Sequence, residues 1–138
     1  MVLILFHAIT TFMLTGLIWT IQYVHYPLFD YLDKTTFAKA NQFHQHQISK
    51  FVVPLMLGEL LSGIYLTLSN SEQFILKLNL ILIALIWLHT FGIMVPIHRQ
   101  LIQGFSKELI SKLSYANWPR TALWSIKSTL MTGLLFFS

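Results

Sequence analysis

Cysteine is absent from this chain of 138 residues, and charged residues are scarce. Without thiols the chain cannot form disulfides, zinc–thiolate sites, cysteine-ligated iron–sulfur clusters or a thiol nucleophile. Charged residues make up 10% of the chain, whereas soluble domains carry about 25%. The sequence also lacks a GxSxG motif, a phosphate-binding loop and an HExxH motif. It therefore offers no motif of a soluble enzyme.

Hydrophobic residues, at 55% of the chain, are in excess of what a soluble core needs. A membrane-spanning helix requires about 20 mostly apolar residues. The stretches that meet this requirement are 2–24, 51–68, 74–95 and 118–137. They predict one all-α domain over residues 1–138, an integral membrane bundle of four transmembrane helices. The first stretch has no basic n-region or small-residue cleavage site, so we do not expect a cleaved signal peptide.

The distribution of charge predicts the orientation of these helices. The connections 25–50 and 96–117 are long and hold most of the charges, whereas 69–73 is a short turn. The positive-inside rule places both long connections in the cytoplasm and both termini outside, as in a bacterial inner-membrane protein. The net charge of +4 thus indicates a lipid bilayer as partner and not nucleic acid.

Two charged residues fall inside the apolar stretches at matching depths. Glu59 lies roughly 13 Å into the second stretch from the cytoplasmic face, and Lys127 lies roughly 13 Å into the fourth. An unpaired charge at the bilayer centre costs at least about 2.5–3.5 kcal/mol. We therefore expect both side chains to face the bundle interior and to pair.

A polar cluster is predicted at the cytoplasmic face. In the first helix Trp19, Gln22 and His25 follow the spacing i, i+3, i+6, so we expect them on one face. The same depth is expected for the residues of three further segments, which are His44, His46, His98, Asn117 and Arg120. Asn117, Arg120, Thr121 and Trp124 are predicted to share one face of the last helix.

The histidines and Glu59 are candidate ligands. Imidazole binds iron, copper and zinc, and a carboxylate adds a further donor, so the candidate metal ligands are His25, His44, His46, Glu59 and His98. Alternatively, His25 and His98 could hold the iron of haem b axially. In the simplest interpretation the histidines only bond to headgroups or to the backbone.

Aromatic and basic residues near the same face leave two interpretations open. One interpretation is an aromatic belt at the membrane interface, and the other is a wall around a flat substrate such as a quinone or a porphyrin. The aromatic residues concerned are Trp19, Tyr23, Tyr26, Tyr115 and Trp118. The arginines near this face are Arg99 and Arg120. They either contact lipid headgroups or bind an anionic group of a substrate through the guanidinium fork.

Several stretches carry a resemblance to a known family: WTIQYVHYPLF, FHQH, VVPLMLGEL, ALIWLHTFGIMVPIHRQLIQGF and ANWPRTALW. Together they resemble, over nearly the whole chain, small bacterial four-helix membrane proteins similar to the DUF1772, anthrone-oxygenase-like group. The matching residues are Trp19, Gln22, His25, Tyr26, Pro27, Glu59, Trp87, Pro96, His98, Gly104, Asn117, Trp118, Arg120, Thr121 and Trp124. The resemblance implies oxygenase activity on polycyclic phenols.

A more distant likeness concerns layout alone. The four-helix membrane protoporphyrinogen oxidase family, which binds haem b, has an early histidine that His7 resembles in position.

Two functional hypotheses follow. The first is a membrane oxidoreductase of oxygenase or oxidase type that acts on a hydrophobic aromatic molecule. Its catalytic residues would be His25, Glu59, His98 and Arg120. A metal or haem would be bound with the help of His25, His98, Trp19, Gln22, Asn117, Trp118 and Trp124. The second is a non-catalytic, homo-oligomeric membrane module, such as an assembly factor, metal chaperone or small-molecule carrier. In that case Gly16, Gly58 and Gly63 would face a partner.

Overall fold

A computed structural model describes residues 2–137, and within that range every element is helical and no strand is present. The elements in chain order are α1 (Val2–Thr20), the π-helix η1 (Ile21–His25), α2 (Tyr26–Leu28), the 3₁₀-helix η2 (Phe29–Tyr31), α3 (Phe37–Ser69), α4 (Phe74–His89), the π-helix η3 (Thr90–Met94), α5 (Val95–Leu101) and α6 (Lys107–Phe137). The predicted all-α fold is confirmed.

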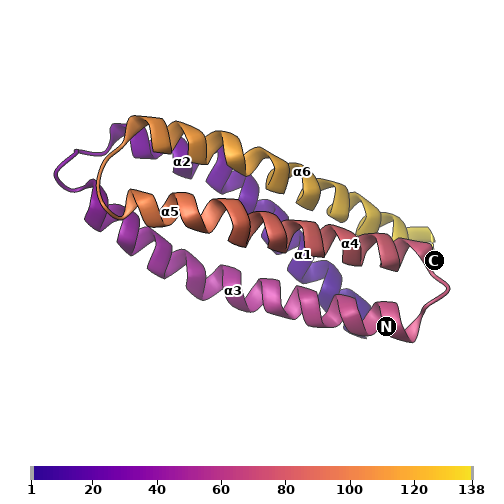
Figure 1. Cartoon of the computed structure of the whole chain (residues 1–138). Helices are drawn as coiled ribbons and strands as arrows, with labels where there is room; N and C mark the ends of the chain where they lie inside the picture. The colour runs from indigo at the N-terminus through magenta and orange to yellow at the C-terminus, as the bar shows by residue number, and fades with distance from the viewer. Residues whose placement is uncertain (1, 138) are drawn as a thin grey trace.

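The long helices pack in a closed ring. α1 contacts α3 and α6, and α4 contacts the same two helices. Figure 1 shows that both chain ends lie where α3 turns into α4, while the two longer connections lie at the opposite end. Three continuous helical stretches are long and apolar enough to cross a membrane, namely Val2–Tyr31, Phe37–Ser69 and Phe74–Leu101. α6 has 31 residues but is not among them.

Four predicted helix boundaries were wrong. The first and third continuous helical stretches end at Tyr31 and Leu101, and not near residues 24 and 95. α3 begins at Phe37 and not near residue 51, and α6 begins at Lys107 and not near residue 118. Residues 107–113 continue into the last helix without a break. Ser106 caps this helix, since its Oγ accepts a hydrogen bond from the Leu109 N–H at 3.3 Å. The length of the apolar stretches predicted the apolar part of each helix but not the more polar residues that extend it.

Two of the four prolines mark the places where a helix changes from π to α geometry. Pro54 and Pro119 lie inside α3 and α6, well past the first turn of each helix. By contrast, Pro27 and Pro96 each follow a π-helix after one intervening residue. A proline ring clashes with the carbonyl four residues earlier and supplies no N–H. The residue before each proline instead bonds five residues back, from Tyr26 N–H to the Ile21 carbonyl and from Val95 N–H to the Thr90 carbonyl.

Many large apolar side chains are exposed on this bundle, while polar and charged side chains are buried within it beside an apolar core. The buried polar and charged residues are His7, Thr10, Thr11, Gln22, Asn41, Glu59, Ser62, Asn79, Asn117, Arg120, Thr121 and Lys127. On α1, for example, Leu5, Ile9 and Met13 are exposed while His7 and Thr11 are buried completely. Apolar residues therefore cover the outside of the bundle, and polar groups meet along its axis.

Glycines contribute unequally to helix packing. A Cβ on Gly63 would lie 2.8 Å from Ile83 Cδ1 and 3.2 Å from His7 Cε1, and one on Gly58 would lie 3.1 Å from Phe6 Cζ. Both glycines thus let helices of the same chain approach closely. Around Gly16 and Gly133, in contrast, no atom lies within 4 Å of such a Cβ, so these two do not serve packing within the chain.

Candidate functional site

The predicted pairing of Glu59 with Lys127 is confirmed. Lys127 Nζ lies 2.9 Å from Glu59 Oε1, and both side chains are shielded almost completely from solvent. The ammonium also donates to Asn79 Oδ1 at 2.8 Å and to Thr11 Oγ1 at 3.0 Å. Its three N–H groups therefore each have a close acceptor, which is what a buried ion pair needs to offset desolvation.

His7 extends this ion-pair network, and its part was not predicted from the sequence. Asn79 Nδ2 donates to His7 Nε2 at 2.9 Å, which leaves the His7 Nδ1–H to donate to Ser62 Oγ at 2.7 Å. Thr11 in turn donates to Glu59 Oε1 at 2.9 Å. Residues from α1, α3, α4 and α6 thus form one saturated network. Polar residues with helical spacing on α1 were the available signal for His7 and Thr11.

A second buried group, here called the polar cluster, joins η1 to α6. Gln22 Oε1 accepts from Asn117 Nδ2 at 2.9 Å, and Gln22 Nε2 donates to the Ser114 carbonyl at 3.1 Å. Arg120 Nη1 donates to Asn117 Oδ1 at 3.2 Å, and its guanidinium lies 5.2 Å from the Trp124 ring centre. The structure thus brings together Gln22, Asn117 and Arg120, as the sequence predicted.

Tyr26 belongs to this cluster and not to the aromatic belt. It is 3% exposed, and its hydroxyl lies 3.2 Å from His98 Nε2. It also lies close enough to Arg120 for the two side chains to interact electrostatically. The π-helix is the reason, because its wider turn rotates Tyr26 inward just before Pro27.

The π-helix also separates His25 from Trp19 and Gln22. Trp19 Nε1 donates to Ser125 Oγ on α6 at 3.0 Å, and Gln22 also contacts α6. His25 instead stacks on His44 of α3, with ring centres 3.7 Å apart. The expected single stripe therefore covers Trp19 and Gln22 but not His25, because a π turn breaks the α-helical spacing from which it was inferred.

The stacked imidazoles line a cavity of about 410 Å³, here called the His pocket. Its other walls are mostly apolar, with Leu28, Phe29 and Phe51 among them. His25 Nε2 is buried and has no hydrogen-bond partner among residues 2–137. His98 lies near enough to interact electrostatically with both histidines. An apolar cavity with two imidazoles suits a hydrophobic molecule that carries an acidic or hydrogen-bonding group.

Several buried polar atoms outside the ion-pair network have no hydrogen-bond partner among the described residues. Within residues 2–137 they lie on His25, Asn41, Trp87, His98 and Arg120. Arg120, at 7% exposed, has an unpartnered Nε, and the described residues give it no ion pair within 4.0 Å. Such groups cost free energy unless a ligand or water completes their bonding. The ion-pair network, by comparison, has no atom in this state, so the two polar regions differ in kind.

The predicted metal ligands are not assembled. No group of three or more His, Asp or Glu side chains in the described range is placed to hold a metal ion. Glu59 is bonded to Lys127, and His46 is exposed while its neighbour His44 points to the pocket wall. Haem ligation through His98 Nε2 would break its bond to Tyr26. The donor set therefore does not fit either group, and no step proposed below uses a metal or haem.

The remaining predicted aromatic residues divide between surface and core. Trp19, Tyr23 and Trp118 form one exposed cluster, in which Trp19 and Tyr23 stack at 5.4 Å and Trp118 meets both edge-on. This arrangement suits an interfacial belt. Trp124 is buried, and its Nε1 lies 3.4 Å from Glu59 Oε2. It therefore links the polar cluster to the ion-pair network.

Comparison with protein-family models, curated proteins and solved structures found no match for this chain. The resemblance to the anthrone-oxygenase-like group therefore stays a hypothesis from the sequence. The function proposed for this chain therefore rests on the geometry of its buried polar groups and of the His pocket.

Proposed function

We propose that the chain is an integral membrane protein with four spanning helices, α6 included. The observation that supports this is the distribution of side chains, with large apolar residues exposed on the outside and the Glu59–Lys127 pair buried inside. In lipid the outward surface must be apolar, and charges are tolerated only when they are paired inside. On α6, Ile126 and Phe136 face outward and Lys127 is paired with Glu59, as these conditions require.

The orientation follows from charge. The two connections at the end of the bundle opposite the chain ends carry or adjoin basic residues, with Lys34 in one of them, Lys39 near the start of α3 and Lys107 at the start of α6. The positive-inside rule then places that end in the cytoplasm, most naturally of a bacterial inner membrane. The His pocket and the polar cluster lie toward this end, within reach of a molecule entering from the cytoplasmic leaflet.

We further propose an oxidoreductase of oxygenase or oxidase type that acts on a hydrophobic aromatic molecule in the His pocket. The observation that carries this is the buried, unpartnered His25 Nε2 of a stacked imidazole pair at the wall of an apolar cavity. A neutral imidazole can accept a proton from an activated C–H or a phenolic O–H. Removal of that proton leaves an electron-rich anion, which reacts readily with oxygen.

Molecular oxygen would be the second substrate. A ring CH₂ group and O₂ give a ring carbonyl and water, so that one oxygen atom enters the product and the other leaves with both hydrogens. His25 would take the first proton and return it to the departing water. His98 and Tyr26 would hold the neighbouring wall, and Arg120 and Asn117 would position η1 through Gln22. Glu59 has no part in this step, because it is held by Lys127.

The test uses purified protein in detergent with two probes. Binding of 2-naphthol, whose fluorescence differs between phenol and phenolate, reports the pocket, and oxygen uptake with anthrone reports turnover. We expect His25→Ala and His44→Ala to abolish uptake and to weaken binding at least about tenfold. His46→Ala is the matched control, because this histidine is exposed and lies two residues from His44 on the same helix. Unchanged binding and uptake in both pocket variants would overturn the proposal.

The second candidate, a non-catalytic carrier or assembly module, uses the same pocket. An exposed apolar groove between α1 and α3, lined by Leu3, Phe6, Leu61 and Tyr65, favours a homo-oligomer in this case. Gly63 no longer supports such an interface, since it is buried within the chain, whereas Gly58 lines this groove and Gly16 remains open. Binding of 2-naphthol without oxygen uptake, in a protein that elutes as an oligomer, would favour this candidate.

A further inference from the structure

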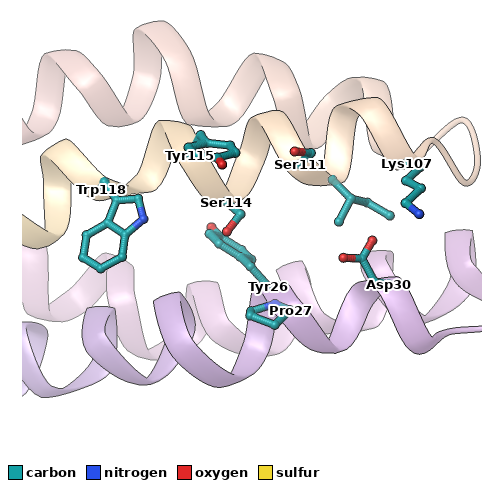
Figure 2. Close-up of a pocket in the computed structure, with 9 residues that line it drawn as sticks. Tyr26, Pro27, Asp30, Lys107, Ser111, Ser114, Tyr115 and Trp118 are labelled. Carbon is teal, nitrogen blue, oxygen red and sulfur yellow. The ribbon is translucent and has the colours of Figure 1, made fainter.

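A second cavity, of about 380 Å³, lies between α2 and the first turns of α6. Figure 2 shows its walls, with Asp30 and Lys107 at one end and Trp118 at the other. Tyr26 forms part of the floor, and Ser111 and Tyr115 lie along the α6 wall. The cavity is separate from the His pocket, which lies between the η1–η2 segment and α3. It is here called the Lys107 pocket.

Asp30 and Lys107 border one end of this pocket as opposite charges that form no ion pair within 4.0 Å. In residues 2–137 the ion pair found within 4.0 Å is Glu59–Lys127, so Asp30 and Lys107 are not bonded to each other. Both are exposed, and both line the cavity. Lys107 also begins α6, a helix of 31 residues whose amino-terminal end favours negative charge. The charged end of the pocket therefore offers one subsite for an anion and another for a cation.

The other end of the pocket is aromatic. Trp118 packs edge-on against Trp19 and Tyr23, and from this point α6 continues into the apolar part of the bundle. Tryptophan and tyrosine favour the level of the lipid headgroups. With the proposed orientation, the charged end of the pocket faces the cytoplasm and the aromatic end faces the acyl chains. A ligand that fits must be zwitterionic at one end and apolar at the other.

We propose that the Lys107 pocket binds the headgroup of phosphatidylethanolamine. The phosphate would contact Lys107 and the Ser111 hydroxyl, and the primary ammonium would donate to Asp30. The acyl chains would leave past Trp118. A phosphatidylcholine headgroup has no N–H to donate to Asp30, and an anionic phosphatidylglycerol headgroup would leave that carboxylate without a counter-ion. This inference rests on the proposed membrane placement but not on the chemistry at the His pocket.

The experiment measures lipid retention by native mass spectrometry on delipidated protein in detergent. Phosphatidylethanolamine, phosphatidylcholine and phosphatidylglycerol are supplied with identical dioleoyl chains. We expect phosphatidylethanolamine to bind at least about fivefold more tightly than either of the others. Asp30→Asn should remove this preference, and Lys107→Gln should weaken binding of both phosphatidylethanolamine and phosphatidylglycerol. Lys112→Gln, an exposed lysine outside the pocket, is the matched control.

Two results of the lipid-retention measurement would overturn the proposal. One is equal retention of the three lipids by the unchanged protein. The other is an unchanged preference for phosphatidylethanolamine in the Asp30→Asn variant, provided that the variant has a native circular dichroism spectrum. Soluble phosphoethanolamine is added as a competitor, and if it binds as tightly as the lipid, the pocket serves a free small molecule and not a membrane lipid. Failure of 2-naphthol to bind would leave this readout untouched. Recovery of the chain in the soluble fraction of cells would instead contradict the membrane placement.

Discussion

At the scale of single residues, the Lys127 ammonium shows how the interior tolerates charge. Its three close acceptors come from Glu59, Asn79 and Thr11, on three other helices. His7 closes the same network through a single tautomer, with Nε2 accepting and Nδ1 donating. Because every group has a partner, the network holds four helices at one relative height.

Removing one member of the pair should therefore be costly. We expect Glu59→Gln and Lys127→Met each to lower the free energy of unfolding by about 3–5 kcal/mol, because a buried charge is left unpaired. The double variant should lose clearly less than the sum of the two. Equilibrium unfolding in mixed micelles measures this, with exposed Glu108→Gln as control. Additive losses in the double variant would contradict the coupling.

At the scale of elements, the two π-helices determine which residues face inward. Each precedes a proline by one residue, and each replaces bonds that the proline would break. The wider turn in η1 turns Tyr26 toward His98 and His25 toward His44. π-helical turns often accompany functional sites. Here η1 supplies His25 to the His pocket and is followed directly by Tyr26, which lines the Lys107 pocket.

Gln22 links η1 to α6 through hydrogen bonds, so its substitution should weaken ligand binding in the His pocket. Gln22→Leu leaves Asn117 Nδ2 and the Ser114 carbonyl without their partner. We expect destabilisation of about 1–3 kcal/mol together with weaker 2-naphthol binding. Gln100→Leu, at an exposed position of α5, is the control. If Gln22→Leu lost stability but bound 2-naphthol normally, η1 would not position the His pocket.

At the scale of the whole molecule, the ring of helices gives the bundle two different ends. One end carries both chain ends and the short turn between α3 and α4, and the other carries the two long connections. Buried polar groups and apolar clusters share the interior between them, and large apolar side chains cover the outside. This asymmetry is what makes the proposed orientation in a bilayer testable.

The absence of cysteine makes the orientation directly measurable, since any introduced thiol is unique. Ser71→Cys lies in the short turn and Lys39→Cys lies near the start of α3, and both positions are exposed. In intact spheroplasts a membrane-impermeant maleimide should label Ser71→Cys alone, and Lys39→Cys should react only after permeabilisation. The opposite pattern would mean an inverted protein, and labelling of both without permeabilisation would contradict spanning helices.

The sequence by itself determined the helical fold and the main interior contact. Long apolar stretches have few alternatives to helix, and the matched depth of Glu59 and Lys127 left pairing as the way to avoid an isolated charge. Asn117, Arg120, Thr121 and Trp124 were placed together because α6 keeps regular spacing through them. These predictions succeeded where the helix was regular or the energetic penalty was large.

Only the tertiary structure decided where the residues of WTIQYVHYPLF point. Regular helical spacing placed His25 beside Trp19 and Gln22, and composition placed Tyr26 at the interface. The π turn before Pro27 changed both, because it adds a residue to one turn and rotates everything that follows. Nor could the sequence show that Glu59 and His46 lie apart from His25. Ligand geometry depends on how four helices pack, and no spacing within one helix determines that.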